Sequence, residues 1–143
     1  MKYPAALIAS AFLLTTLLAA APDNDAESPD PLVIEKLEEI VKIRERIAET
    51  ARLEFALGKT VAFNEAAIEL SEAKIALASE KREPAVVVSE LNAIVALRQE
   101  QLDREKALVE DSRRTEEGIS VIRVKLLEAE VRLHRAKTQY GIK

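Results

Sequence analysis

Residues 119–140 read ISVIRVKLLEAEVRLHRAKTQY, and the spacing of their apolar side chains decides the fold class. The apolar positions recur at alternating intervals of three and four, at Ile119, Ile122, Leu126, Ala129, Leu133, Ala136 and Tyr140. Because an α-helix turns once in about 3.6 residues, these side chains lie on one face of a single long helix. Such heptad-like spacing is typical of helices that pack side by side along their length.

Three stretches upstream have the same spacing. Their apolar stripes run from Ile34 to Phe55, from Phe63 to Leu77 and from Val88 to Val109. The residues between the stripes predict turns. Gly58 suits the end of the first helix, Pro84 suits the first turn of the third, and residues 111–118 interrupt the last two stripes. We therefore predict an all-α protein with four long helices.

The chain also repeats itself. The sequence IVKIRERI at residues 40–47 resembles IVALRQEQ at residues 94–101, which lies 54 positions later. The sequence SEAKIALASEK at residues 71–81 resembles LEAEVRLHRAK at residues 127–137, which lies 56 positions later. Self-similarity at a fixed period indicates that one supersecondary unit occurs twice. Each half of the chain is thus predicted to be one helix–turn–helix unit.

The repeat sets the predicted domain organisation. We expect two tandem antiparallel helical hairpins, one over about residues 32–82 and one over about residues 84–140, with both turns at the same end of the molecule. A chain of 143 residues has room for one domain. The helical domain is therefore predicted to span residues 32–143, with coiled-coil or four-helix-bundle packing.

The N-terminal residues differ in composition from the rest. Lys2 precedes an uncharged apolar run over residues 5–21 that ends in small residues. This arrangement is typical of a secretory signal peptide, so we expect residues 1–21 to be removed on export, to the periplasm or, as the alternative, to the medium. An uncleaved membrane anchor stays open, because the run is at the lower length limit for a bilayer span. After cleavage we expect no integral membrane span.

Residues 22–31, PDNDAESPDP, follow this apolar run. Three prolines in ten residues exclude a helix interior, and the acidic side chains favour solvation. We predict a disordered acidic linker here.

Two arginines occupy equivalent positions of the repeat. Arg44 and Arg98 each lie on the apolar stripe of their helix. Folding each hairpin about its turn brings Arg44 close to Glu72 and Arg98 close to Glu128. We predict one interhelical Arg–Glu pair in each hairpin that fixes its register. The alternative is that each arginine extends along the apolar surface to water.

The composition excludes most kinds of active site. The net charge is −4, there is no cysteine, and His134 is the single histidine. A mildly acidic chain without a basic stripe lacks the clustered cations that nucleic-acid binding needs. Without cysteines and further histidines, thiolate metal sites and Cys–His pairs cannot form. In the acidic segment 110–117, Arg113 and Arg114 oppose cation binding. We expect no enzymatic activity, no cofactor and no metal site.

The segment FALGKTVAFNEAAIELSEAKIAL at residues 55–77 has an aromatic residue three positions before a glycine, then a short polar turn and a helix with periodic alanines. This pattern resembles the hairpin tips of TolC-like outer-membrane efflux proteins, over about residues 40–137. In the second half, Ser112 replaces the glycine and Gly118 takes the place of the family's usual aspartate. The chain has no alternating polar and apolar run for the family's membrane strands. The resemblance therefore implies a relative of the periplasmic hairpins without the transport activity.

The resemblance also implies that the hairpin tips contact a partner. The predicted tip residues are Gly58, Lys59, Thr60, Ser112, Arg113, Arg114 and Thr115.

Apolar residues beyond the main stripes suggest protein contacts. Val124, Leu127 and Val131 form a second stripe on the last helix, and Val86, Val87 and Ile94 widen the third. These residues either join the two hairpins into one bundle or bind a protein partner or another copy of the chain. We expect a non-catalytic structural or interaction protein of the cell envelope, within an export or efflux assembly. The alternative is a periplasmic helical chaperone or stress sensor that holds clients in a cleft between the hairpins.

Overall fold

The computed structural model describes residues 28–58, 62–111 and 116–143. They form four α-helices, α1 (Pro31–Ala56), α2 (Phe63–Glu80), α3 (Pro84–Glu110) and α4 (Glu116–Tyr140), and no strands within these ranges. The predicted all-α fold with four long helices is confirmed.

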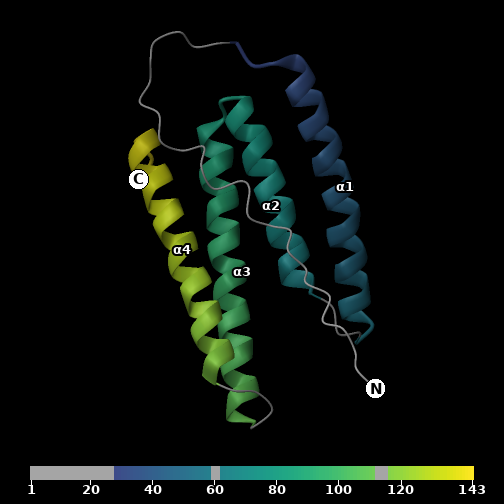
Figure 1. Ribbon diagram of the computed structural model, residues 1–143, viewed down its shortest axis with the longest axis vertical. Coiled ribbons are helices and arrows are strands. Elements are labelled where there is room, and N and C mark those ends of the chain that lie inside the picture. Colours follow the sequence, from purple (N-terminus) through teal and green to yellow (C-terminus); the bar gives the residue numbers. More distant parts are fainter. Residues whose placement is uncertain (1–27, 59–61, 112–115) are drawn as a thin grey trace, which may run out of the picture.

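The helices lie in a single row in the order α1, α2, α3, α4 (Figure 1). Each helix packs against its neighbour in the chain, and α2 packs against α3 about as extensively as the helices within each hairpin pack together. The C-terminal ends of α1 and α3 lie at the same end of the molecule, as the repeat predicts (Figure 1). Among the described residues, the backbones of α1 and α4 do not approach each other. The arrangement is therefore an open row in which α1 and α4 are the edges.

The start and end of α1 follow from local sequence. The carboxylate of Asp30 accepts a hydrogen bond of 2.9 Å from the backbone N–H of Leu32, and Pro31 occupies the first turn. Asp30 and Pro31 belonged to the predicted disordered linker, and they instead begin the helix because an aspartate cap followed by proline is a strong start. Gly58 follows the end of α1 with φ of 75°, the left-handed conformation in which glycine is favoured.

The turn between α2 and α3 has an unusual residue at its centre. Arg82 has φ of 57°, a region that side chains with a Cβ rarely adopt. The N–H of Glu83 donates a 2.8 Å hydrogen bond to the carbonyl of Ala78, which closes the end of α2. This is the hydrogen bond of a Schellman cap, in which glycine is the usual left-handed residue.

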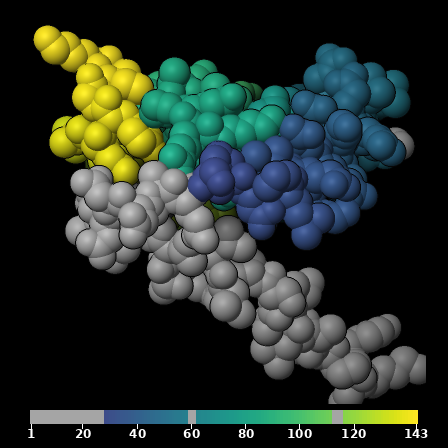
Figure 2. Space-filling model, turned by 90° about the horizontal axis from the view of Figure 1, so that it is seen from above, coloured from purple at the N-terminus to yellow at the C-terminus, as the bar shows by residue number. Residues whose placement is uncertain are grey.

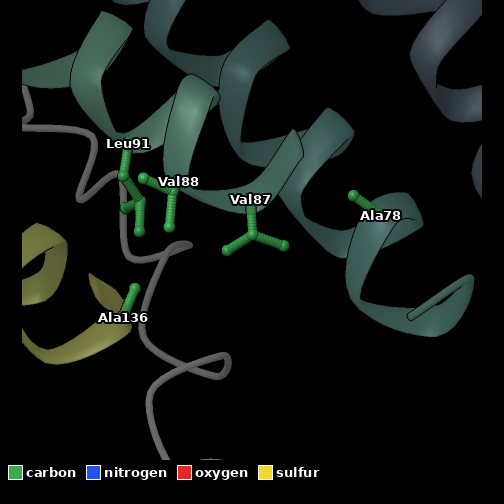
Figure 3. Close-up of a cluster of buried hydrophobic side chains, with 5 residues drawn as sticks. All are labelled: Ala78, Val87, Val88, Leu91 and Ala136. Atoms are coloured by element: carbon green, nitrogen blue, oxygen red, sulfur yellow. The ribbon is translucent and has the colours of Figure 1, made fainter. Parts of the chain in front are cut away.

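The core lies where the two hairpins meet. One cluster of buried side chains draws on α2, α3 and α4 and comprises Ala78, Val87, Val88, Leu91 and Ala136 (Figure 3). A second, closer to the hairpin tips, comprises Ile68 of α2, Ile94 of α3 and Ala129 of α4. Both clusters combine residues from the two hairpins, so the hairpins form one unit. In α1, by contrast, the buried residues are only Ala48 and Ala51.

Candidate interaction surfaces

One side of α1, next to the face that packs on α2, carries exposed apolar residues in a helical stripe. Val33, Ile40, Ile43 and Ile47 are all at least two-fifths exposed. Spacings of seven, three and four place them on one face of the helix. The neighbouring face of the helix, with Ala48 and Ala51, packs on α2. We call the four exposed residues the α1 edge.

The outward side of α4 carries a similar stripe. Val121, Val124, Leu127 and Val131 are each about half exposed, and successive members are three or four positions apart. The buried face of α4, which includes Leu126 and Ala129, packs on α3. We call the four exposed residues the α4 edge. It contains the second stripe that the sequence analysis singled out, whereas the α1 edge was not anticipated.

The two helices that carry these edges lie on opposite sides of the molecule. Figure 2 looks along the helices, with α4 at one side in yellow and α1 at the other in blue, and α2 and α3 between them. Runs of exposed β-branched and leucine side chains along two edge helices leave apolar surface that a closed bundle would bury. Within one chain, the described helices cover neither edge.

The other apolar residues predicted to lie outside the main stripes have a different place. Val86 is exposed, whereas Val87 and Ile94 of α3 are buried between the hairpins. They join the two hairpins into one unit, which was the first of the two alternatives for these residues.

The register arginines have partners other than the predicted ones. Arg44 forms an ion pair with Glu69, whereas Glu72 was predicted. Arg98 donates to Glu65 at 2.6 Å, whereas Glu128 was predicted. The prediction considered only partners within a hairpin. Because α2 also faces the second hairpin, Glu65 comes within reach of Arg98.

Glu65 links the hairpins electrostatically. It accepts hydrogen bonds from Arg98 at 2.6 Å and Gln101 at 3.3 Å, and Lys125 of α4 lies 3.7 Å away. Partial burial raises the pKa of the Glu65 carboxyl, but the bond and charge of Arg98, with Lys125, outweigh burial and hold that pKa below its ordinary value. The ionised carboxylate is thus part of the contact between hairpins.

Glu72 makes the second polar link between the hairpins. Both carboxylate oxygens of Glu72 accept from the guanidinium of Arg132 on α4, at 2.5 and 2.8 Å. Hydrogen bonding to Glu72 raises the pKa of Arg132 despite its partial burial. The Glu72 carboxylate therefore points towards α4, which leaves Glu69 as the partner of Arg44.

A buried amide lies beside these ion pairs and was missed by the sequence analysis. Asn64 is buried at the start of α2, and its side-chain N–H donates to the backbone carbonyl of Leu97 at 3.2 Å. Within the described part of the chain, the Asn64 carbonyl oxygen has no hydrogen-bond partner. The only hint in the sequence is a polar residue next to an apolar stripe, which is too common to single out.

The hairpin tips are only partly described. Lys59, Thr60, Ser112, Arg113, Arg114 and Thr115 lie outside the described residues. Beside Gly58, the rings of Phe55 and Phe63 stack with centroids 6.0 Å apart, and the guanidinium of Arg104 lies 5.1 Å from the centre of the Phe55 ring. The aromatic residue before the glycine thus joins α1 to α2 and reaches α3.

Gly118 allows α4 to begin close to α3. A Cβ at this position would lie 2.6 Å from a carboxylate oxygen of Glu105, which is itself buried. An aspartate here, the residue usual in the TolC-like pattern, would bring a second carboxylate against that of Glu105. The glycine therefore fits the close helix contact in this chain.

A shallow groove runs between α1 and α2 near the tip of the first hairpin. Ile47 and Ala51 line one side, and Ala62 and Ala66 line the other, with Glu69 among the charged residues around them. The groove is open to solvent, and most of its exposed lining surface is apolar. It therefore has the character of an apolar contact surface.

The described ranges also bear on metal sites and on membrane spans. No group of three or more histidine, cysteine, aspartate or glutamate side chains there could hold a metal ion. No helix within these ranges is both long and apolar enough to cross a membrane.

Comparison of the chain with protein-family models, with curated proteins and with solved structures finds no match.

Proposed function

We propose that this is a non-catalytic structural and interaction protein of the cell envelope, exported by residues 1–21 and working within an export or efflux assembly. Its task is to present long helical faces to a protein partner. Export is supported by the basic and apolar composition of the N-terminal residues. The link to an export assembly is supported by the resemblance of the hairpin tips to TolC-like proteins.

One observation carries the interaction function. Eight apolar side chains, four on the α1 edge and four on the α4 edge, are exposed at helical spacing on the two outer helices. Isolated exposed apolar residues are normal on protein surfaces, whereas contiguous stripes mark sites of protein contact. These edges are also the parts of the fold that the packing of the hairpins does not use.

Site-specific photo-crosslinking in the producing cells tests the proposal. A photoreactive amino acid at Ile43 or Val124 should give discrete covalent adducts, because both side chains lie within the apolar stripes. The matched control is Val86, which is also exposed but lies outside both edges. Absence of adducts at both edge positions, or equal yields at Val86, would contradict the interaction function. Recovery of the chain in the cytoplasm with residues 1–21 still present would contradict export.

The alternative function, a helical chaperone, is favoured by the open groove between α1 and α2. The region between the hairpins, where the sequence analysis expected a client cleft, is filled by Ile68, Ile94 and Ala129. A chaperone would therefore hold clients along the groove at Ile47 and not between the hairpins. Suppression of aggregation of an unfolded outer-membrane protein that is lost in Ile47→Glu and kept in Val124→Glu would favour this alternative.

A further inference from the structure

The internal repeat relates the exposed edges to the buried contact between the hairpins. A residue of α1 has its equivalent in α3 54 positions later, and a residue of α2 has its equivalent in α4 56 positions later. The contact between the hairpins is made by α2 and α3. Its equivalent would therefore be a contact between α4 and α1. Within one chain this equivalent contact is not made, since these two helices are the opposite edges of the row (Figure 2).

The α1 edge matches the side of α3 that packs on the first hairpin. Ile94 of α3 is 2% exposed, and its equivalent on α1, Ile40, is 45% exposed. Val87 is 5% exposed, and its equivalent Val33 is 40% exposed. The same correspondence relates Leu97, which packs against the second cluster, to Ile43. The α1 edge thus keeps the apolar character of a buried face without a helix to cover it.

The α4 edge matches the side of α2 that packs on the second hairpin. Ile68 is 5% exposed, and its equivalent Val124 is 54% exposed. Ile75, which packs against both clusters, corresponds to the exposed Val131. The α4 edge therefore resembles the side of α2 that packs on α3. Its complement is a helix equivalent to α3, and in the repeat that helix is α1.

One polar pair of the observed contact is replaced on both sides together. Between the hairpins, Glu65 accepts a hydrogen bond from Gln101. Their equivalents are Val121 on the α4 edge and Ile47 on the α1 edge. A polar pair has thus been replaced by an apolar pair, which is the change that preserves complementarity if these two residues meet.

Not every exposed apolar residue follows this pattern. Leu32 and Val86 are equivalent residues of α1 and α3, and both are exposed. The contact of α3 with the first hairpin is observed, and Val86 lies outside it. This position is therefore not part of the contact face. This distinction shows that the match of the edges concerns the contact face and not apolar residues in general.

We propose that the α4 edge of one copy binds the α1 edge of a second copy, in the manner in which α2 packs against α3 within the chain. The proposal deepens the proposed function, since it names the partner of the apolar edges. In the new contact Val124 meets Ile40, and Val131 meets Val33. The up-and-down alternation of the helices continues from one copy to the next.

The contact uses different surfaces on the two copies, so a pair of bound copies still has one free edge of each kind, the α1 edge of one copy and the α4 edge of the other. Such head-to-tail contacts produce a closed ring when the rotation between copies closes and an open filament when it does not. Association therefore extends beyond the dimer.

Disulfide trapping tests the contact directly, because the chain contains no cysteine. Purified Ile40→Cys and Val124→Cys chains are mixed and oxidised under mild conditions. In the matched control, a Lys42→Cys chain takes the place of the Ile40→Cys chain. Lys42 is exposed and lies two residues along α1 from Ile40, on a different face of the helix. The double variant Ile68→Cys/Ile94→Cys within one chain calibrates the reaction, since these residues belong to one cluster.

A disulfide between Ile40→Cys and Val124→Cys chains should form on the order of tenfold faster than in the control mixture, because docking gives the two thiols a high effective concentration. Equal rates in the two mixtures would overturn the proposal. Disulfides that form only between two copies of the same variant would also overturn it, because they indicate a two-fold contact. A disulfide formed within one chain that carries both cysteines would overturn it as well. If these tests fail while photo-crosslinking in cells joins the edges to another protein, the proposed function stands and the self-association does not.

Discussion

Replacing Ile94 by alanine and, separately, its repeat equivalent Ile40 by alanine gives a matched test of the packing. Both changes remove the same three carbon atoms. Ile94 is 2% exposed in the cluster with Ile68 and Ala129, whereas Ile40 is 45% exposed on the α1 edge. At about 0.8 kcal/mol for each buried carbon, Ile94→Ala loses about 2.4 kcal/mol of transfer free energy. The cavity that remains brings the expected loss to about 3 kcal/mol.

In the isolated chain, Ile40→Ala should lower the free energy of unfolding by only about 1 kcal/mol, because nearly half of the side chain already contacts water. Urea unfolding followed by far-ultraviolet circular dichroism, at a protein concentration low enough to keep the chain monomeric, measures both losses. Equal losses would refute the reasoning, because they would mean that the contact between the hairpins is not the packed part of the fold. At higher protein concentration, the loss from Ile40→Ala should grow if the α1 edge is covered by a second copy.

The remaining predictions concern individual contacts. Glu65→Gln should lower the free energy of unfolding at neutral pH and make the loss of stability in acid less steep. The pKa of Glu65 is lower in the folded chain than in the unfolded chain. The contribution of Glu65 to stability is therefore present above its unfolded pKa and is lost as the pH falls through its folded pKa. A pH series of urea midpoints checks this, and an unchanged acid limb would count against it. Arg82→Gly should raise the free energy of unfolding by about 0.5 kcal/mol, because glycine adopts the left-handed backbone conformation without strain. Arg82→Ala is the control, since it removes the same side chain but keeps a Cβ, and it should give no such gain. Equal effects of the two changes in chemical denaturation would contradict this explanation. A double-mutant cycle on Arg132 and Glu72 should give a coupling of about 0.5–1 kcal/mol that weakens in salt, and zero coupling would mean that the pair does not join α2 to α4.

The fold could be predicted because its determinants are local. The alternation of three and four residues from Ile119 to Tyr140 needs no knowledge of neighbours, and Gly58 and Pro84 delimit helices through their own backbone preferences. The repeat then predicted that both turns lie at one end. These features depend on periodicity and on residue type alone.

The pairing of charged residues could not be predicted in the same way. When each hairpin is considered alone, the sequence predicts Glu128 as the partner of Arg98, whereas the packing of α2 on α3 brings Glu65 to it. A helix with neighbours on two sides offers several carboxylates at similar distances, and only the three-dimensional arrangement selects among them. The α1 edge was missed for a related reason: Ile40, Ile43 and Ile47 lie beside the main stripe, and their exposure depends on which side α2 occupies.

The absolute mass of the purified chain in solution, measured by light scattering over a range of concentrations, tests the central claim most directly. The account predicts a mass that is a multiple of the single chain for the unchanged protein, with a return to the single-chain mass in Val124→Glu and in Ile40→Glu. Both substitutions place a charge on an exposed edge, so the helical content should not change. A single-chain mass for the unchanged protein at all concentrations would contradict the claim that the α1 and α4 edges bind each other.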